Sequence, residues 1–445
     1  MKQAAEGTFP RFSAGRHPRT AIGISKDSAT LYLVTVDGRR ESDSGMSLVE
    51  MAGTITRRDF LARMAIAAGA TALGCTDSSG PDPDPTPGTL DHVIVVTMEN
   101  RSFDHLLGWV PGADGKQAGL TYPDRNNVPI PTHHLTDFQG CGFADPDHSF
   151  QGGRAEYNNG ACDGWLRTDG NDIYAIGYYQ AADLPFLGQA APKWTVLDRY
   201  FCPIMGPTFP NRLVSVAGQT DRLSNTLVAS TLPTIWDRLS AAGLTGRNYG
   251  NSLTTSTLWG SRYASIIHPI TSFFSDAAAG ALPSVAFVDP DLSDDFSDSY
   301  HPPGDIRNAE AFLASVYKAV TTSPLWSKSL LVLTFDEWGG FYDHVAPPVA
   351  PIPPGERDIG NMDGLRGFRI PTILVSPFVK QGHVSSKVYD HASVLRLIES
   401  RWSLQPLTVR DASANNLMDE LDLTQAPSAP PVINVPAGPF GACCA

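Results

Sequence analysis

Short apolar runs alternate with segments of helical spacing from about residue 90 onward. Apolar side chains recur every three or four positions in residues 234–242, 309–320 and 392–402, the last behind Asp390 as a predicted N-cap. Alternation of this kind predicts an α/β fold in which helices sandwich a mostly parallel central sheet. The predicted strands are residues 92–97, 194–196, 284–288, 330–335 and 372–375.

Two stretches interrupt the alternation. Residues 111–190 are rich in Gly, Asp, Asn, Tyr and His and contain few apolar runs, and residues 345–366 form a second long, Pro-rich stretch. Long ordered loops on a scaffold often line binding sites. We therefore predict loop insertions over an active site, with 111–190 as a lid or insertion beside it.

The N-terminal region contains an export signal. The segment TRRDFL at 56–61 has the twin-arginine pattern, and a mildly apolar run, 64–74, follows it up to Cys75. This run of about 11 residues is too short to span a bilayer. Residues 46–75 are predicted to be a twin-arginine signal peptide, and residues 76–89 a linker.

The residues around this signal leave two questions open. Residues 1–45 are interpreted as a non-native or disordered extension, with the true start at Met46 or Met51. The sequence ALGC at 72–75 is an imperfect lipoprotein cleavage box, so lipidation of Cys75 and ordinary cleavage near it are both open. The mature protein is expected to be periplasmic, secreted or lipid-anchored at Cys75.

The remainder is predicted to be a catalytic domain at 90–425 and a C-terminal tail at 426–445. Disulfides form outside the cytoplasm, and Cys141 and Cys162 are the predicted pair. Composition is that of a globular protein, with 42% hydrophobic and 18% charged residues. The net charge of −13 and the lack of a basic run argue against nucleic-acid binding.

Polar residues follow two of the predicted strands directly. Glu99 and Asn100 come after the first, and Asp336 and Glu337 after the fourth. Chemistry in open α/β sheets collects at the carboxyl ends of strands, and carboxylate and amide oxygens suit a hard cation. Taken alone, the first pair also fits a helix N-terminus capped by Asn100 or Ser102.

A third segment carries a hydroxyl in a fixed backbone. Pro207 and Pro210 flank Thr208, and Arg212 follows four residues after it. A hydroxyl becomes a nucleophile when a metal or a base lowers its pKa, and an arginine in fixed register can hold a turn or clamp a phosphate. A Pro-rich turn with a surface threonine is the alternative.

Histidines beside Pro or Asp form the fourth set. They are His148, His301 and His391, whereas His344 belongs with Asp336 and Glu337 because it follows Glu337 by seven residues. A lone histidine is more often structural than catalytic, so each is a candidate only together with the other three segments.

Together these segments resemble the bacterial phospholipase C / acid phosphatase phosphoesterase family, which includes the plant non-specific phospholipases C. The matching stretches are ENRSFDHLLG at 99–108, TFPNR at 208–212, DEWGGFYDHV at 336–345 and GFRIPTILVSP at 367–377. The resemblance covers roughly residues 90 to 402. It implies an alkaline-phosphatase-like fold.

The resemblance also implies roles for individual residues. Thr208 would be the nucleophile, with His148, His301 and His344 contacting phosphate or protonating the leaving alcohol. One divalent cation, such as Zn or Ca, would be held by Glu99, Asn100, Thr208, Asp336 and Glu337. Residues expected to contact substrate are Arg212, Asn211, Tyr157 and Asp343.

The predicted function is therefore that of a metal-dependent phosphoesterase. A phospholipase C that hydrolyses glycerophospholipids at a membrane surface, through a phosphothreonine intermediate, is the first hypothesis. An acid phosphatase acting on phosphomonoesters is the second. A non-catalytic surface lipoprotein that binds lipid or phosphate is the alternative of another class.

Overall fold

The computed structural model describes residues 19–24, 31–36, 88–168, 170–292 and 298–441. The chain divides into two units, Met1–Pro83 and Asp84–Ala445. In the first unit, β1 (Arg19–Ile24) pairs antiparallel with β2 (Leu31–Val36). These strands fall within the stretch expected to be disordered. The predicted signal peptide at 46–75 lies outside the described residues, as does nearly all of the linker.

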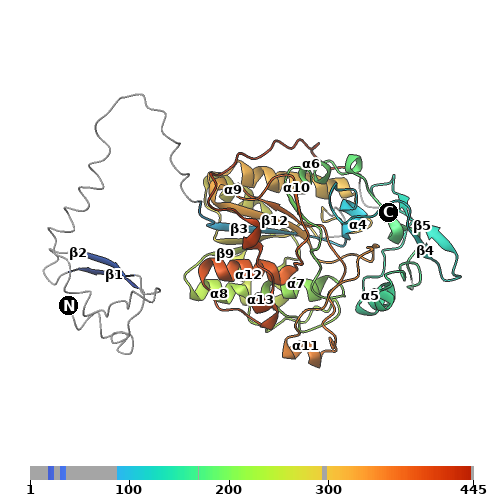
Figure 1. Ribbon diagram of the computed structural model, residues 1–445, viewed down its shortest axis with the longest axis horizontal. Coiled ribbons are helices and arrows are strands. Elements are labelled where there is room, and N and C mark those ends of the chain that lie inside the picture. Colours follow the sequence, from blue (N-terminus) through green and yellow to red (C-terminus); the bar gives the residue numbers. More distant parts are fainter. Residues whose placement is uncertain (1–18, 25–30, 37–87, 169, 293–297, 442–445) are drawn as a thin grey trace. The chain divides into compact units, whose positions relative to one another are not determined.

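An eight-stranded sheet forms the centre of the second unit (Figure 1). Its strand order is β10-β9-β11-β3-β12-β13-β8-β14. β13 (Ile373–Val375) runs antiparallel to both of its neighbours, and all the other pairs are parallel. The mostly parallel α/β sheet that the sequence predicts is thus confirmed.

The two central strands show why the sequence pattern predicted them correctly. β3 (His92–Met98) and β12 (Ser329–Phe335) lie side by side, and all of their residues except His92 are buried. Parallel strands covered on both faces read as continuous apolar runs, which is how both appear in the sequence. β11 (Val285–Val288) and β8 (Thr195–Leu197) also match predicted strands.

Three short strands complete the sheet. β9 (Gly246–Tyr249), β10 (Ile267–His268) and β14 (His383–Ser385) were not predicted. Each has two to four residues and includes polar side chains, so none forms an apolar run.

Helices cover both faces of the sheet. In the view of Figure 1, α9 (Ile270–Ala279) and α10 (Ile306–Thr321) lie above it, and α7 (Thr208–Ala217), α8 (Ile235–Ala241) and α12 (His391–Trp402) lie below. Asp390 is the N-cap of α12, as predicted, and its side chain accepts a hydrogen bond from the Ala392 N–H. Shorter α-helices are α4 (Phe103–Leu107), α5 (Phe150–Tyr157), α6 (Leu187–Ala190), α11 (Pro354–Asp358) and α13 (Val409–Ser413).

The segment 111–190 contains α5, α6 and four short strands. These strands are β4 (Thr121–Pro123), β5 (Pro129–Pro131), β6 (His133–His134) and β7 (Gly177–Tyr178). Its aromatic residues are mostly buried; Trp165, for example, packs on Phe368 with ring centroids 4.6 Å apart. Trp165, Tyr178 and Tyr179 therefore form part of the packing of this segment. The described chain also contains short 3-10 helices at Asn158–Gly160, Ile173–Ile176, Ala181–Asp183, Trp326–Lys328 and Leu417–Glu420. A longer 3-10 run spans Thr255–Ile266.

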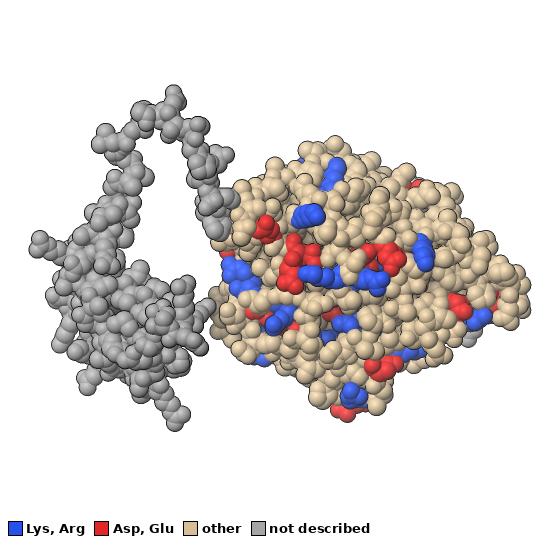
Figure 2. Space-filling model, in the orientation of Figure 1, with Lys and Arg blue, Asp and Glu red and all other residues tan. Residues whose placement is uncertain are grey.

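Three further features bear on the sequence predictions. Cys141 is disulfide-bonded, whereas Cys162 and Cys202 are free and buried, so the predicted Cys141–Cys162 pair is wrong. No helix in the described part of the chain combines the length and the apolar character needed to cross a bilayer. Charges of both signs intermingle on the face shown in Figure 2, without a large basic patch.

Candidate active site

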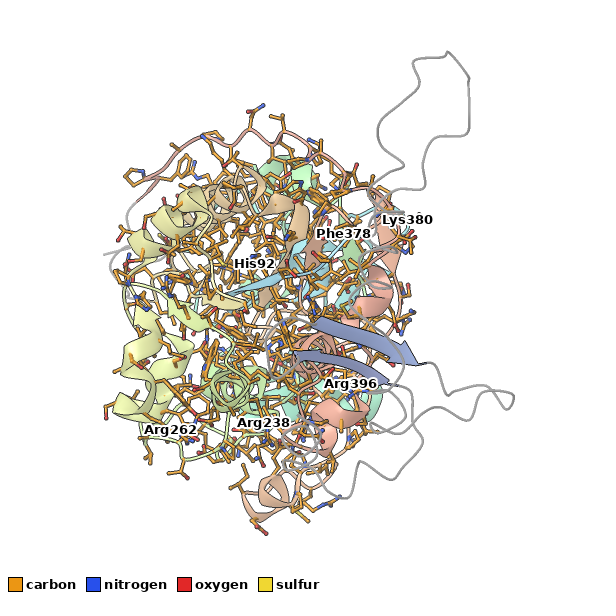
Figure 3. The ribbon with its side chains drawn as sticks, turned by 90° about the vertical axis from the view of Figure 1, so that its left-hand side faces the viewer. His92, Arg238, Arg262, Phe378, Lys380 and Arg396 are labelled. Atoms are coloured by element: carbon orange, nitrogen blue, oxygen red, sulfur yellow. The ribbon has the colours of Figure 1, made fainter. Side chains whose placement is uncertain are left out.

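Three neighbouring parallel strands end in acidic residues. β3 leads into Glu99, β12 into Asp336 and Glu337, and β11 into Asp289. β3 lies between the other two, and the register pairs Met98 with Phe335 and Val96 with Val288. The carboxyl groups are therefore brought to one edge of the sheet. Figure 3 shows the other end of the strands, where β3 begins at His92.

Arg212 joins these three strand ends to helix α7. Its Nε donates to Asp336 Oδ2 at 3.2 Å, and its terminal nitrogens pair with Asp289 Oδ1 at 2.6 Å and Glu99 Oε1 at 3.3 Å. The same nitrogens also donate to Thr255 Oγ1 and to the Thr97 carbonyl, so all five N–H groups are used. Burial works against the charge, but the three carboxylates outweigh it and raise the pKa of Arg212.

Thr208 is the first residue of α7, one turn before Arg212. Residues four apart lie on one face of a helix, so Thr208 shares the face that Arg212 turns toward the strand ends. Pro207 provides no side-chain cap, and Asn225 accepts the N–H of Phe209 at 2.8 Å. The Thr208 side chain is almost buried, and no hydrogen bond joins its hydroxyl to another described residue. The hydroxyl is thus available for chemistry at a helix N-terminus.

Two acceptor oxygens at this edge lack a donor. Asn100 Oδ1 and Glu337 Oε1 are buried and have no hydrogen-bond partner within the described structure. Unpaired buried acceptors are costly, and amide and carboxylate oxygens are ligands that suit a divalent cation. These two oxygens are therefore open ligands for the cation that the sequence predicts, whereas Glu99, Asp336 and Glu337 are not among the groups of described residues with metal-ligand spacing.

Local backbone geometry holds Asn100 in place. It has a positive φ of 59°, and its N–H donates to Asp336 Oδ1 at 3.1 Å. A Cβ at Gly339 would lie 2.1 Å from the Asn100 carbonyl oxygen, so only glycine allows the chain after β12 to pass this close. The capping role that Asn100 and Ser102 shared as candidates belongs to Ser102, whose Oγ accepts the His105 N–H at the start of α4.

Burial and mutual repulsion raise the pKa values of the carboxyl groups at this edge. Burial, followed by the neighbouring Asp336, raises the pKa of Glu337 well above its usual range. Burial and Asp336 likewise raise the pKa of Glu99 to about 7, although Arg212 opposes this. Both Asp336 oxygens accept hydrogen bonds from protein groups, which leaves the orphaned oxygens of Asn100 and Glu337 as the open ligands.

Two of the predicted histidines lie at the same edge. His148 Nε2 is 3.3 Å from Asn100 Nδ2 and 4.0 Å from Glu337 Oε1, and His301 Nε2 is 3.9 Å from Asp145 Oδ2. Each histidine donates its Nδ1–H to a backbone carbonyl, at Pro146 and Pro302 respectively, so each Nε2 faces the site. Asp145, His148 and His301 form one of two groups of described residues with metal-ligand spacing.

His344 lies in a different cluster. Its Nδ1 pairs with Asp104 at 2.5 Å and its Nε2 with Asp114 at 3.2 Å. Asp343 receives two hydrogen bonds from the buried Arg369, which also pairs with Asp104. None of the hydrogen bonds or ion pairs of His344 and Asp343 in the described structure reaches Thr208, Asn100 or Glu337. We call Asp104, Asp343, His344 and Arg369 the second cluster; its first three members are the other group with metal-ligand spacing.

The remaining predicted residues have structural partners. Asn211 is fully buried and braces the turn before Thr208 through the Ile204 N–H and the Gly206 and Pro207 carbonyls. Tyr157 ends α5, half-buried against the core. His391 donates to the Asp336 carbonyl at 3.0 Å, and burial lowers its pKa to about 4. Direct substrate contact by Arg212, Asn211, Tyr157 and Asp343 stays a prediction.

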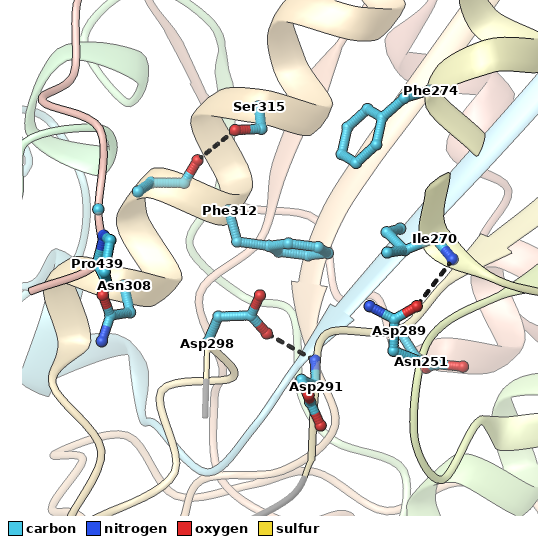
Figure 4. Close-up of a pocket in the computed structure, with 12 residues that line it drawn as sticks. Asn251, Ile270, Phe274, Asp289, Asp291, Asp298, Asn308, Phe312, Ser315 and Pro439 are labelled. Carbon is cyan, nitrogen blue, oxygen red and sulfur yellow. Dashed lines mark hydrogen bonds between the residues drawn. The ribbon is translucent and has the colours of Figure 1, made fainter. Parts of the chain in front are cut away.

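Sequence reasoning missed Asp289 and Asp145. Asp289 directly follows a predicted strand, which is the signal that led to Glu99 and Asp336, so the same rule would have found it. Asp145 lies in an irregular loop, and only its spacing to His148 hints at a role. Asp289 also lines a cavity of about 340 Å³ with Asn251, Asp298 and Phe312 (Figure 4). Thr208, Asn100 and Glu337 do not line that cavity, so it is not the catalytic pocket.

Fold and site together place a hydroxyl at the start of α7 and buried oxygens without hydrogen-bond partners at the ends of the strands of an α/β sheet. Residues 90–405 match the sequence model of the Phosphoesterase family. The chain therefore belongs to the Phosphoesterase family and is a phosphoric ester hydrolase. This match confirms the resemblance that its motifs indicated. A second model, that of phosphodiester glycosidase, matches residues 1–63, too small a part of the chain to show membership.

Named relatives are similar over most of the chain. Non-specific phospholipase C6 of Arabidopsis thaliana is 33% identical over 371 residues, covering 74% of this chain and 71% of the plant protein. Phospholipase C B of Mycobacterium tuberculosis is 28% identical, covering 84% of this chain and 87% of that protein. The non-hemolytic phospholipase C of Pseudomonas aeruginosa is 29% identical; this chain spans 54% of its length.

Solved structures are more distant. A protein in the alkaline phosphatase superfamily from Vibrio parahaemolyticus is 10% identical, with a TM-score of 0.36 over 83% of this chain and 81% of that chain. A phosphonate monoester hydrolase of Agrobacterium radiobacter has the same TM-score over 76% and 77%. TM-scores of this size do not establish a shared fold. The alkaline-phosphatase-like fold therefore stays an expectation.

Proposed function

We propose that this chain is a phospholipase C that cleaves glycerophospholipids to diacylglycerol and a phosphorylated head group. The observation that carries the proposal is that Arg212, one turn after Thr208, joins helix α7 to the strand ends where the Asn100 and Glu337 oxygens lack hydrogen-bond partners. Named relatives that are phospholipases C support the substrate class.

The chemistry begins at Thr208. Its oxygen attacks the phosphorus of the diester in line with the leaving diacylglycerol oxygen, and that phosphorus–oxygen bond breaks. A phosphothreonine forms and carries the head group. Water then attacks the phosphorus, the bond to Thr208 breaks, and the phosphorylated head group leaves.

Asn100 and Glu337 would hold the divalent cation, with Glu99, Asp336 and Thr208 as the further predicted ligands. A cation at this position supplies positive charge that favours the deprotonated hydroxyl and the charged phosphoryl group. The protein groups keep this edge ordered, because Arg212 fixes Glu99 and Asp336 while leaving the Asn100 and Glu337 oxygens open.

His301 is suited to protonate the leaving alcohol. Burial works against its charged form, but the nearby carboxylates of Glu99 and Asp145 outweigh burial and raise its pKa. Because its Nδ1–H is committed to the Pro302 carbonyl, the proton it can transfer sits on Nε2. His148, whose Nε2 also faces the site, would contact the phosphoryl oxygens.

The choice between diester and monoester rests on the relatives. Those reported above are named phospholipases C, which favours a diester substrate and does not favour the acid phosphatase alternative. Family membership also favours an enzyme over a non-catalytic lipid-binding lipoprotein.

A substrate panel tests the proposal directly. The purified chain is incubated with phosphatidylcholine in mixed micelles and with p-nitrophenyl phosphate, and diacylglycerol and p-nitrophenol are measured. We expect diacylglycerol release at a kcat/KM at least tenfold above that for the monoester. Monoester hydrolysis alone would replace the proposed phospholipase with a phosphatase.

We also infer that the chain is exported through its twin-arginine signal. The inference rests on the TRRDFL segment and on the apolar run that leads to Cys75. Export would bring the enzyme to a compartment where its disulfide at Cys141 can form.

A further inference from the structure

Large apolar side chains are exposed on segments that contact the candidate site. Nine such side chains are exposed in the described part of the chain. Five of them lie on segments next to Thr208, Met205 or Asp145, and we call these five the apolar rim: Phe143, Ile173, Leu227, Val228 and Met362.

Leu227 and Val228 are the most exposed members of the rim, at 82% and 67%. They follow Asn225, whose side chain accepts the N–H of Phe209, the residue after Thr208. Arg222 donates to the Thr226 carbonyl and so holds the backbone just before the two apolar residues. The loop therefore presents Leu227 and Val228 to solvent from a braced position beside the first turn of α7.

Phe143 and Ile173 lie on the histidine side of the site. Phe143 stacks on Tyr174 with ring centroids 5.2 Å apart, and Ile173 directly precedes that tyrosine. Asp145, two residues after Phe143, lies 3.9 Å from His301 Nε2. These two apolar residues thus belong to the wall that carries the proposed leaving-group acid.

Met362 belongs to a third segment. Its neighbour Asp363 pairs with Arg154 at 2.9 Å, and Arg154 also donates to the Met205 sulfur, three residues before Thr208. The exposed Arg357 donates to the Met362 carbonyl at 3.4 Å. The guanidinium of Arg357 therefore lies beside this apolar residue, and a guanidinium is suited to binding lipid phosphates.

We propose that the apolar rim docks the mouth of the site onto a phospholipid bilayer surface. This inference rests on the proposed function, since a diacyl lipid must leave its bilayer to reach Thr208. The rim consists of separated apolar residues among polar ones and is not a continuous groove, so it suits a fluid interface more than a shape-matched protein. Exposed apolar side chains gain free energy on entering the acyl boundary, in proportion to the area removed from water.

The chain offers a matched control for the rim. Val409 and Val432 are exposed to 48% and 75%, but they lie elsewhere. Val409 is on α13, whose Thr408 contacts Gly218 at the far end of α7, and Val432 follows Pro431, which accepts a hydrogen bond from Tyr317 on α10. A ten-residue helix is about 15 Å long, so α13 contacts the end of α7 opposite to Thr208.

Vesicle flotation tests the docking separately from catalysis. The full chain carrying Thr208→Ala is mixed with phosphatidylcholine vesicles, either alone, with L227S/V228S, or with V409S/V432S. We expect L227S/V228S to lower the vesicle partition coefficient at least tenfold and V409S/V432S to change it less than twofold. Met362→Ser, which removes a rim residue from a different loop, is expected to lower it about threefold, and thermal melting confirms that each variant is folded.

Activity assays separate failure of the rim from failure of the proposed function. In the active chain, L227S/V228S should slow hydrolysis of phosphatidylcholine vesicles at least tenfold and leave kcat/KM for soluble p-nitrophenyl phosphorylcholine within twofold. Vesicle binding that is absent in the parent chain, or equal in L227S/V228S and V409S/V432S, would overturn the inference. Rim-dependent binding without hydrolysis of any phosphodiester would instead refute the proposed function and leave the docking surface standing.

Discussion

Arg212 donates its Nε–H to the Asp336 carboxylate at 3.2 Å, and with this contact it ties the helix that begins at Thr208 to the end of strand β12. Both residues are almost completely buried. The same guanidinium reaches Glu99 and Asp289, so one side chain sets the position of three strand ends relative to helix α7. Arg212 is therefore best described as a positioning residue.

Replacing Arg212 by Met should destabilise the protein strongly. The change leaves three buried carboxylates without the guanidinium group that pairs with them. Breaking a buried ion pair in this way typically costs about 3–5 kcal/mol. Urea denaturation measures the loss. The control is Arg199→Met, which removes a half-exposed pair with Asp114 and should cost less than about 1 kcal/mol. Equal losses in the two variants would show that the buried network contributes no special stability.

Thr208→Ala should abolish turnover without unfolding the protein. The hydroxyl has no hydrogen-bond partner in the described structure, so its removal leaves no buried group unpaired. Loss of a nucleophile lowers kcat by at least about 1000-fold, whereas Thr208→Ser keeps the hydroxyl and should retain measurable activity. Kinetics on phosphatidylcholine and a melting curve check both statements. An alanine variant with full activity would remove Thr208 from the mechanism.

The central strands were predictable because they are buried on both faces. β3, β8, β11, β12 and β13 all appear as apolar runs, and α10 and α12 as helical patterns. Helix α7 was missed because Pro207 and Pro210 indicated a turn. Proline is compatible with the first turn of a helix, where N–H groups have no intrahelical acceptor, and α7 begins between these two prolines.

The site was predictable where polar residues directly follow central strands. Glu99, Asn100, Asp336 and Glu337 meet at one edge for that reason. His344 was grouped with them because it is only seven residues from Glu337. A short separation in sequence does not show, however, which way the chain turns after the strand. Gly339 and Gly340 have positive φ values of 64° and 72°. Beyond this turn His344 pairs with Asp104 of the second cluster and with Asp114 next to it.

Removal of divalent cations should inactivate the enzyme reversibly. Exhaustive chelation is expected to lower kcat/KM at least 100-fold, since positive charge beside the phosphoryl group is lost. Glu337→Gln should lower the affinity for the cation at least tenfold, as measured by metal content after dialysis, whereas Asp363→Asn on the exposed Arg154 pair should not. Full activity in protein shown to be metal-free would exclude the cation role.

His344 should stabilise the fold most at mildly acidic pH. Burial works against its charged form, but Asp104 and Asp343 outweigh burial and raise its pKa above the ordinary value of about 6.5, with Arg369 opposing them. A raised folded-state pKa gives stability that is complete below the unfolded pKa and is lost as pH rises through the folded pKa.

We therefore expect His344→Asn to lose about 1–2 kcal/mol near pH 5.5, the range for hydrogen bonds to charged groups after allowance for partial exposure. The difference from the parent protein should shrink as the pH approaches 9. Urea denaturation at several pH values gives the comparison. A difference that stays constant across this range would show that charge on His344 does not hold the second cluster together.

Export should depend on Arg57 and Arg58. Lysine keeps the charge at both positions but lacks the guanidinium that defines the twin-arginine pattern, so R57K/R58K is expected to retain most of the precursor in the cytoplasm. The matched control is Arg63, which lies in the same signal segment but outside the arginine pair. Arg63→Lys should leave export unchanged. Cell fractionation followed by immunoblotting measures the ratio of precursor to exported protein, and normal export of R57K/R58K would show that residues 46–75 do not act as a twin-arginine signal.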